Sequence, residues 1–568
     1  MLKSRENKMI YFFLIAAAIG LSIKYIFVDL GIDAEYQVAM GYRLALGDIM
    51  FKEMWEAHQT SAFLCAFFIK IYLFLFKTTT GIVLYLQVIG VLIDGAISYL
   101  LYRTVSMLQN SKRVAFAMAW VFFVVSPKDV PIAEFANMQV WFCMLLCLLM
   151  FIYYQTTQKR YLVLAALSLC AAVLSYPSCA ILLAGVGFLF FRYGKKKDFF
   201  LFTGICAITG IIYLCFILKD TSFTELLFSL EHMLSIEPTH TVSLGGKFLA
   251  YGKDALKFAG VLFIIYIIAF GITMICKRTN ATYKDKGAVL TDILFYTLSL
   301  LLCFYMVICW QTYTRCYYSL VFITIILIGL HHAKRLSGEK LYLYICGTTI
   351  SVLNFFATIL LTDLDLITSV PYLLIALVMA FLPITEVLAE LKEKNLLSTL
   401  IRLALIGGIV FLTFRNAYII RPMNGHMQTI MDIGGIVKGG PAVGIVSEYM
   451  GTYMQNESLK EWEQYIEEDS YIYIIGSNID TLGYLYADTN VAAPSVMSTP
   501  GYNDSISKYW EMNPDKYPDI VIASCWYGNL DAGLTQNQWM MNWIEEEFKP
   551  QYYIDGKYWR YYFRNAPK

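Results

Sequence analysis

Long apolar segments alternate with short basic loops along most of this chain, and this pattern limits the fold to one that crosses a membrane repeatedly. A helix needs about 20 apolar residues to cross the hydrocarbon core of a bilayer. Segments near that length recur from residue 9 to residue 419. Charged residues make up only 15% of the 568 residues, against about 25% in soluble domains. The net charge of +1 gives no reason to expect a nucleic-acid partner.

Lysine and arginine clusters indicate which loops face the cytoplasm, because these residues concentrate in cytoplasmic loops. The clusters follow alternate segments, at 103–113, 159–160, 192–197, 277–286, 334–335 and 392–394. We therefore expect about thirteen transmembrane helices, with the N-terminus inside and the chain after the last helix outside. The apolar run 61–76 is short for a span, and the charge pattern places both its ends outside. We expect it to be interfacial or re-entrant.

The composition changes after Arg421, where glycines and a proline between residues 434 and 441 indicate a loop-rich entry. Strand-length apolar runs follow at 471–475 and 520–523, and two more flank Asp555-Gly556, which predicts a hairpin. We predict a small C-terminal extracytoplasmic α/β domain. The expected domains are a membrane module, 1–420, with outer loops 29–80 and 219–257, and the α/β domain, 421–568.

The densest polar chemistry near the membrane lies in residues 31–64, directly after the first apolar segment. Asp33 and Glu35 open this stretch, and apolar residues at helical spacing predict a short helix over Ala34–Leu46, along the bilayer surface. A carboxylate at the boundary of lipid and water is costly unless it has a partner or a task. Asp33 can be the N-cap of this helix or an active-site group, and both interpretations remain open from these residues.

This order of features resembles the GT-C glycosyltransferases, which include the protein O-mannosyltransferases and the lipid A aminoarabinose transferases. The matching features are an Asp-x-Glu motif at 33–35 just outside the first span, an amphipathic helix, and an aromatic–acidic–x–His segment at 55–58. The resemblance implies a polytopic helical fold in the cell membrane. It also implies transfer of a sugar from a polyprenyl-phosphate donor to a glycan, lipid or protein acceptor on the outer face, with inversion. Many members read His-Pro-Pro where residues 58–60 here are His-Gln-Thr.

The resemblance also implies roles for individual residues. Asp33 is the expected catalytic base, and Glu134 matches a second acidic residue near the start of a later span, although a solvated loop charge is the alternative. Arg315 stands where members carry an Arg-Tyr or His-Tyr pair. Its guanidinium suits the donor phosphate, and snorkelling to lipid head groups is the alternative. The expected substrate-binding residues are Glu35, Tyr36, His58 and Arg315.

A single carboxylate base suffices for this chemistry, because a polyprenyl phosphate leaves as a stable anion and needs no general acid, unlike the alkoxide leaving group of glycoside hydrolysis. No glycine-rich nucleotide-binding motif is present in the sequence. A divalent metal beside Asp33 and Glu35 is an option that some family members use, and the sequence does not require one. We assign no metal ligands, because His232 and His240 lack ligand spacing.

A different functional class remains open: a non-enzymatic transporter or assembly protein for lipid-linked saccharides. Polar residues inside the spans would favour it, and the notable one is Asp94. Acidic residues concentrate instead in the expected outer loops, which favours the enzyme.

Overall fold

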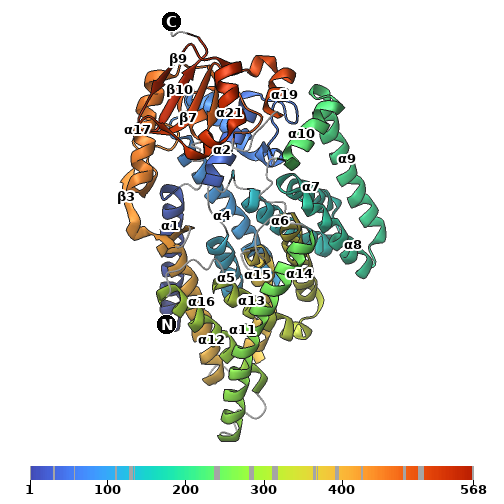
Figure 1. The fold of residues 1–568 in the computed structure, drawn as a ribbon. Coiled ribbons are helices and arrows are strands. Elements are labelled where there is room, and N and C mark those ends of the chain that lie inside the picture. The colour runs from blue at the N-terminus through green and yellow to red at the C-terminus, as the bar shows by residue number, and fades with distance from the viewer. Residues whose placement is uncertain are drawn as a thin grey trace.

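The computed structural model is mostly helical, and the C-terminal part of the chain covers one end of the helices (Figure 1). The structure describes residues 2–29, 32–56, 58–108, 112–126, 132–133, 135–235, 244–279, 287–309, 317–361, 366, 369–390, 396–423, 426–476, 481–496 and 505–565. The helices that precede the C-terminal part are α1 (Leu2–Phe27), α2 (Ile32–Leu46), α3 (Phe63–Phe76), α4 (Ile82–Leu108), α5 (Lys112–Val125), α6 (Phe135–Thr156), α7 (Lys159–Ser175), α8 (Leu182–Arg192), α9 (Lys196–Asp220), α10 (Phe223–Ser235), α11 (Leu244–Thr279), α12 (Gly287–Cys309), α13 (Tyr317–His332), α14 (Gly338–Leu361), α15 (Leu374–Glu390) and α16 (Leu396–Tyr418).

The protein is a multi-pass membrane protein. Within the described residues, nine helical segments are long and apolar enough to cross a membrane: Met9–Phe27, Gln59–Phe76, Ile82–Leu108, Phe135–Thr156, Lys196–Asp220, Gly245–Thr279, Gly287–Met306, Gly338–Ile359 and Val370–Glu390. Pro177–Arg192 and Leu403–Tyr418 are shorter apolar helices.

The expected number of thirteen spans is not confirmed by helix length. Helices α5, α7 and α13 form where spans were expected, but they have 14, 17 and 16 residues, and a straight crossing needs about 20. The run 61–76, expected to be too short to cross, is part of a longer helical segment. A 3₁₀ turn at Gln59–Ala62 continues into α3, so that Gln59–Phe76 reaches 18 residues and is long enough to cross.

Side-chain hydrogen bonds connect the membrane helices to one another. Trp141 of α6 donates its indole N–H to Asp94 of α4 at 3.0 Å. Gln139 of α6 donates to Asn354 and Thr358 of α14, at 2.7 and 3.1 Å. Such bonds satisfy polar groups that lipid cannot solvate, and they hold transmembrane helices together. Asp94 therefore makes a helix-packing contact.

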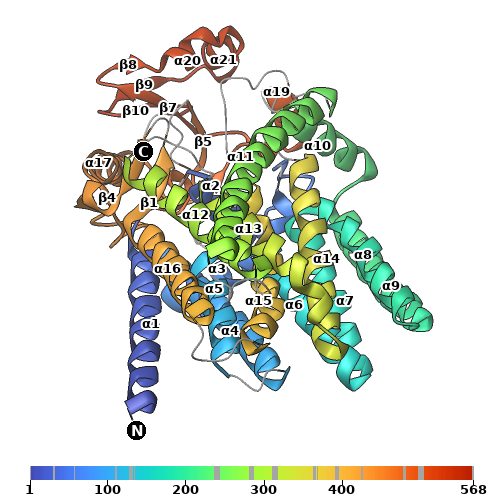
Figure 2. The same cartoon turned by 90° about the horizontal axis from the view of Figure 1, so that it is seen from below.

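The first and last of these helices lie side by side (Figures 1 and 2). Near the end of α1, Lys24 donates from Nζ to two backbone carbonyls, that of Asn416 in the last turn of α16 and that of Ile419, the residue after α16. A lysine at this position suits the negative end of the helix dipole. Trp120 of α5 also donates to the carbonyl of Leu14 in α1, at 2.9 Å.

The C-terminal part forms a mixed sheet with helices around it. Its order is β6-β5-β7-β10-β9, with β8 paired to β7. Strand β5 is parallel to both neighbours, and β10 is antiparallel to both of its neighbours. The elements are β1 (Ile419–Met423), β2 (His426–Thr429), β3 (Ile433–Ile436), β4 (Val446–Glu448), α17 (Tyr449–Tyr465), β5 (Tyr471–Ile475), α18 (Gly483–Tyr486), β6 (Asn490–Val491), α19 (Ser505–Met512), β7 (Ile520–Trp526), β8 (Asn529–Leu530), α20 (Ala532–Gln536), α21 (Gln538–Asn542), β9 (Tyr552–Asp555) and β10 (Trp559–Phe563). The predicted strands and hairpin are confirmed. We call residues 446–563 the C-terminal region.

Helix α2 ends at the expected residue, begins two residues before the expected start, and is buried over most of its length. Every residue from Ala34 to Arg43 is buried within the protein, and the expected position of α2 along the bilayer surface stays a prediction. It packs against α3 and also contacts α18 and β6 of the C-terminal region. Segments more than 400 residues later in the sequence contact α2, and no pattern within residues 31–64 predicts that contact.

Candidate active-site region

A fully buried arginine organises the loop that follows α2. Arg43 donates from Nε to Asp48 at 2.8 Å and from Nη1 to Glu56 at 3.0 Å. Nη2 donates to the backbone carbonyl of Glu53 at 2.7 Å, and Nη1 also donates to that of Pro494 at 3.2 Å. Burial alone lowers the pKa of a guanidinium, yet the neighbouring carboxylates, Asp48 first, leave the pKa of Arg43 above its ordinary value. The loop is therefore held by charge-assisted hydrogen bonds in a water-poor environment.

The same carboxylates are also bonded from the C-terminal region. Lys516 donates to Asp48, and the hydroxyl of Ser495 and the backbone N–H of Val496 donate to Glu56, at 2.5 and 2.7 Å. We call Arg43, Asp48, Glu56 and Lys516 the Arg43 clamp. It fixes the position of α2 and its loop relative to the C-terminal region.

His58 joins three segments by ring stacking. Its imidazole stacks on Phe135 at 4.2 Å between ring centroids and lies 5.9 Å from the ring of Tyr176. Burial lowers the pKa of His58 to about 4, so the ring is neutral near pH 7. A neutral, stacked ring positions the start of α6 and the turn after α7 against the loop.

The lowered pKa of His58 predicts a pH dependence of stability. Between pH 6.5 and pH 4 the unfolded chain binds a proton on this ring that the folded chain does not, so stability falls as the pH falls. In the variant His58→Phe, which keeps a stacking ring, we expect thermal unfolding midpoints to fall less steeply over this range. His232, whose pKa burial also lowers to about 4, will leave part of the slope. An unchanged slope would contradict the assignment.

The start of α6 lies against α2. The side-chain oxygen of Gln37 accepts a hydrogen bond from the backbone N–H of Phe135 at 2.9 Å. In the first turn of α6, Asn137 is fully buried, and neither its amide oxygen nor its amide nitrogen has a hydrogen-bond partner within the described part of the chain. A buried amide in this state is available to a bound molecule or to water.

The structure describes only some of the expected site residues. Glu35 is buried and accepts from the side chain of Gln455 in α17 at 3.4 Å, and Tyr36 is buried beside it. Helix α2 begins at Ile32, which places the backbone of Asp33 in the first turn. The side chain of Asp33, and the whole of Glu134 and Arg315, lie outside the described residues. Glu35, Tyr36 and His58 thus lie in the segments that Gln37 and Phe135 connect.

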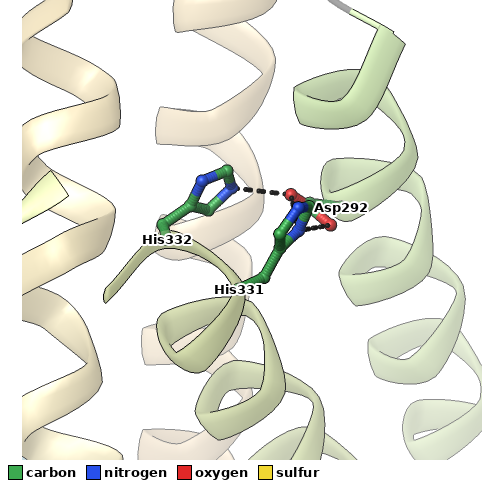
Figure 3. Close-up of side chains that lie close together, drawn as sticks. All are labelled: Asp292, His331 and His332. Atoms are coloured by element: carbon green, nitrogen blue, oxygen red, sulfur yellow. Dashed lines mark hydrogen bonds and ion pairs between the residues drawn. The ribbon is translucent and has the colours of Figure 1, made fainter. Parts of the chain in front are cut away.

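A second group of chemically interesting side chains was missed in the sequence. Asp292, His331 and His332 meet between α12 and α13 with geometry that could hold a metal ion (Figure 3). The available signal was a histidine pair at the end of an apolar helix, together with an aspartate inside another apolar helix.

No family model matches the sequence, and no curated protein matches it. Similar solved structures include oligosaccharyltransferase from Archaeoglobus fulgidus in complex with Zn and sulfate, at 14% identity and a TM-score of 0.45 over 90% of this chain and 67% of that one. The same enzyme tethered to an acceptor peptide with the NVT sequon gives 12% identity and a TM-score of 0.45, over 90% and 68%. Archaeal oligosaccharyltransferase AglB from Archaeoglobus fulgidus, with an inhibitory peptide and a dolichol-phosphate, gives 11% and 0.40, over 90% and 69%.

TM-scores of 0.45 or less do not assign a fold class, so the GT-C arrangement remains the prediction made from the sequence.

Proposed function

We propose that this chain is a membrane glycosyltransferase that moves a sugar from a polyprenyl-phosphate donor to a glycan, lipid or protein acceptor on the outer face, with inversion. The supporting observation is the contact between α2 and α6, where Gln37 accepts from the backbone of Phe135. It joins the helix whose first turn contains Asp33 to the residue that directly follows Glu134. The ring of His58 stacks on Phe135 and on Tyr176, and so brings the turn at Tyr176 next to the start of α6.

In this proposal Asp33 removes the proton of the acceptor hydroxyl. The acceptor oxygen forms a bond to the anomeric carbon of the sugar while the bond from that carbon to the polyprenyl phosphate breaks. A carboxylate with an ordinary pKa near 4 is a weak base at neutral pH, and partial removal from water strengthens it. Glu35 and Tyr36, two and three residues after Asp33 in α2, are buried. Their burial supports a water-poor environment around Asp33. Glu134 orients the acceptor and Arg315 offsets the charge that develops on the phosphate.

The proposal also places the C-terminal region outside the cell, over the site. The Arg43 clamp supports this arrangement, because it bonds that region to the loop between α2 and α3. Expected partners are the lipid-linked donor, the acceptor and the surrounding bilayer.

The direct test is transfer by the purified full chain in lipid nanodiscs. Polyprenyl-phosphate donors with different sugars are offered together with envelope glycan, lipid and peptide acceptors, with and without Mg²⁺ or Mn²⁺. We expect release of polyprenyl phosphate and a product with the opposite anomeric configuration, which nuclear magnetic resonance can assign. Donor binding and movement across proteoliposome membranes without any bond cleavage would instead support the transporter class.

The buried amide of Asn137 gives a prediction that separates function from stability. Leucine has a similar volume and no polar atoms, so Asn137→Leu removes a buried amide that has no partner among the described residues. We expect the thermal midpoint to stay constant or rise, while kcat/KM for transfer falls about tenfold, as for loss of one substrate hydrogen bond of about 1.4 kcal/mol. A lower midpoint with unchanged kcat/KM would show that Asn137 serves packing.

A further inference from the structure

We infer that Asp292, His331 and His332 form a binding site for a divalent transition-metal ion of the zinc type, separate from the α2 region. Imidazole nitrogens and carboxylate oxygens are ordinary ligands of zinc, and three protein ligands leave a fourth position for water. The inference does not depend on the proposed sugar transfer.

The distances between the ligand atoms suit a single ion. His332 Nε2 lies 2.7 Å and His331 Nδ1 lies 3.3 Å from the same carboxylate oxygen of Asp292, and the ligand atoms of all three residues lie within 4.8 Å of one another. Two ligands that are each about 2.1 Å from a tetrahedral zinc ion are separated by roughly 3.4 Å. Small side-chain rotations therefore make room for the ion.

The ring of His331 also points at Asp292, although the hydrogen bond from His332 alone would satisfy that carboxylate. Successive helical residues project about 100° apart, yet Figure 3 shows both imidazole rings directed at Asp292. Helix α13 ends at His332 and a 3₁₀ turn follows at Ala333–Arg335, which lets the two rings stack at 4.6 Å. One histidine would satisfy the carboxylate, and the second supplies another ligand.

The burial of the three side chains suits an ion that can enter from one side. The side chains of Asp292 and His332 are 10% and 4% exposed, whereas that of His331 is 49% exposed. Mostly apolar grooves flank the group, one lined by Leu262, Phe263 and Phe295, the other by Val289, Ile325 and Val387. A carboxylate in such surroundings is costly, and a dication on it offsets that cost.

The site lies at the end of the helices that the basic residues mark as cytoplasmic. His332 lies two residues before Lys334, and Asp292 is in the second turn of α12, which follows the basic stretch of sequence 277–286. Positively charged loops face the cytoplasm, so the ion would come from the cytoplasmic side. A bound ion would fix the end of α13 to the start of α12.

The test is metal binding by the full-length protein, purified in detergent with a histidine-free affinity tag and stripped with a chelator. After addition of Zn²⁺ or Co²⁺ and removal of unbound ion, we expect one ion per chain by mass spectrometry, together with visible absorption from bound Co²⁺. His331→Gln and Asp292→Asn should each lower the affinity at least tenfold, because even indirect changes around a metal site cost 10- to 100-fold. His426→Gln, in β2, is the matched control and should bind like the wild type.

The variants also guard against a loss of folding. Asn at position 292 keeps an oxygen that can accept from His332, and the exposed ring of His331 can be replaced with little effect on packing. Unfolding midpoints without metal should therefore match the wild type. Equal Co²⁺ binding by the wild type and by His331→Gln, or no binding by the folded wild type, would overturn the inference whatever the outcome of the transfer assay.

Discussion

Replacing Arg43 by methionine is expected to lower the free energy of unfolding by about 3–5 kcal/mol, the usual cost of removing one partner from a buried ion pair. The change leaves Glu56, which is fully buried, without its cationic partner, and it leaves Asp48 with Lys516. Methionine keeps most of the volume, so the loss comes from charge rather than from a cavity. Thermal unfolding of the purified protein in detergent measures the effect.

Two further variants identify the origin of the Arg43 effect. Adding Glu56→Gln to Arg43→Met removes the uncompensated charge while leaving an oxygen for the backbone N–H of Val496, and it should recover part of the stability. Arg103→Met is the matched control, because Arg103 is exposed and its contact is a 3.4 Å bond to Tyr99. Equal midpoints for the Arg43 and Arg103 variants would show that the clamp contributes little.

Replacing Asp33 by asparagine is expected to lower kcat for sugar transfer by a factor of about 10²–10⁴, the usual contribution of a general base. Asparagine has nearly the same shape, and the loss of a negative charge in the first turn of a helix costs about 0.3–1 kcal/mol, so the start of α2 should be preserved. The measurement is single-turnover transfer from the polyprenyl-phosphate donor, with the unfolding midpoint recorded on the same sample.

A carboxylate outside the site supplies the comparison for Asp33. Asp220, at the end of α9, is 45% exposed and lies 3.7 Å from Lys219, and Asp220→Asn should transfer sugar at the wild-type rate. If Asp33→Asn is also fully active, Asp33 is a helix-terminal residue and the base lies elsewhere. Lost activity with a much lower midpoint would assign Asp33 to folding instead.

The parts of the fold that depend on neighbouring residues were predictable from the sequence. The Asp555-Gly556 turn specifies its hairpin locally, and β9 and β10 pair as expected, with Asp555 opposite Arg560. The 3.6-residue spacing of apolar side chains likewise located α2 to within two residues at its start. Span counting was weaker, because α5 and α13 are shorter than a straight crossing requires.

The parts that depend on distant residues were not predictable. The bond from Arg43 to Pro494 joins positions 451 residues apart, and no local pattern shows that partner. An arginine and two acidic residues in a polar loop look like surface charges until the C-terminal region covers them. For the same reason, the burial of α2 under the C-terminal region was not predicted, and the pair His331 and His332 does not by itself indicate the aspartate about 40 residues earlier.

The contact of Lys24 with the end of α16 has a consequence for biosynthesis. The carbonyl of Asn416 is 392 residues from Lys24, and ribosomes add about 5–20 residues per second. The N-terminal helix therefore waits roughly 20–80 seconds in the membrane before its polar partner is translated. During that interval Lys24 depends on lipid head groups or on the insertion machinery for hydrogen-bond partners. In a polypeptide that stops before residue 416, Lys24 keeps those partners permanently.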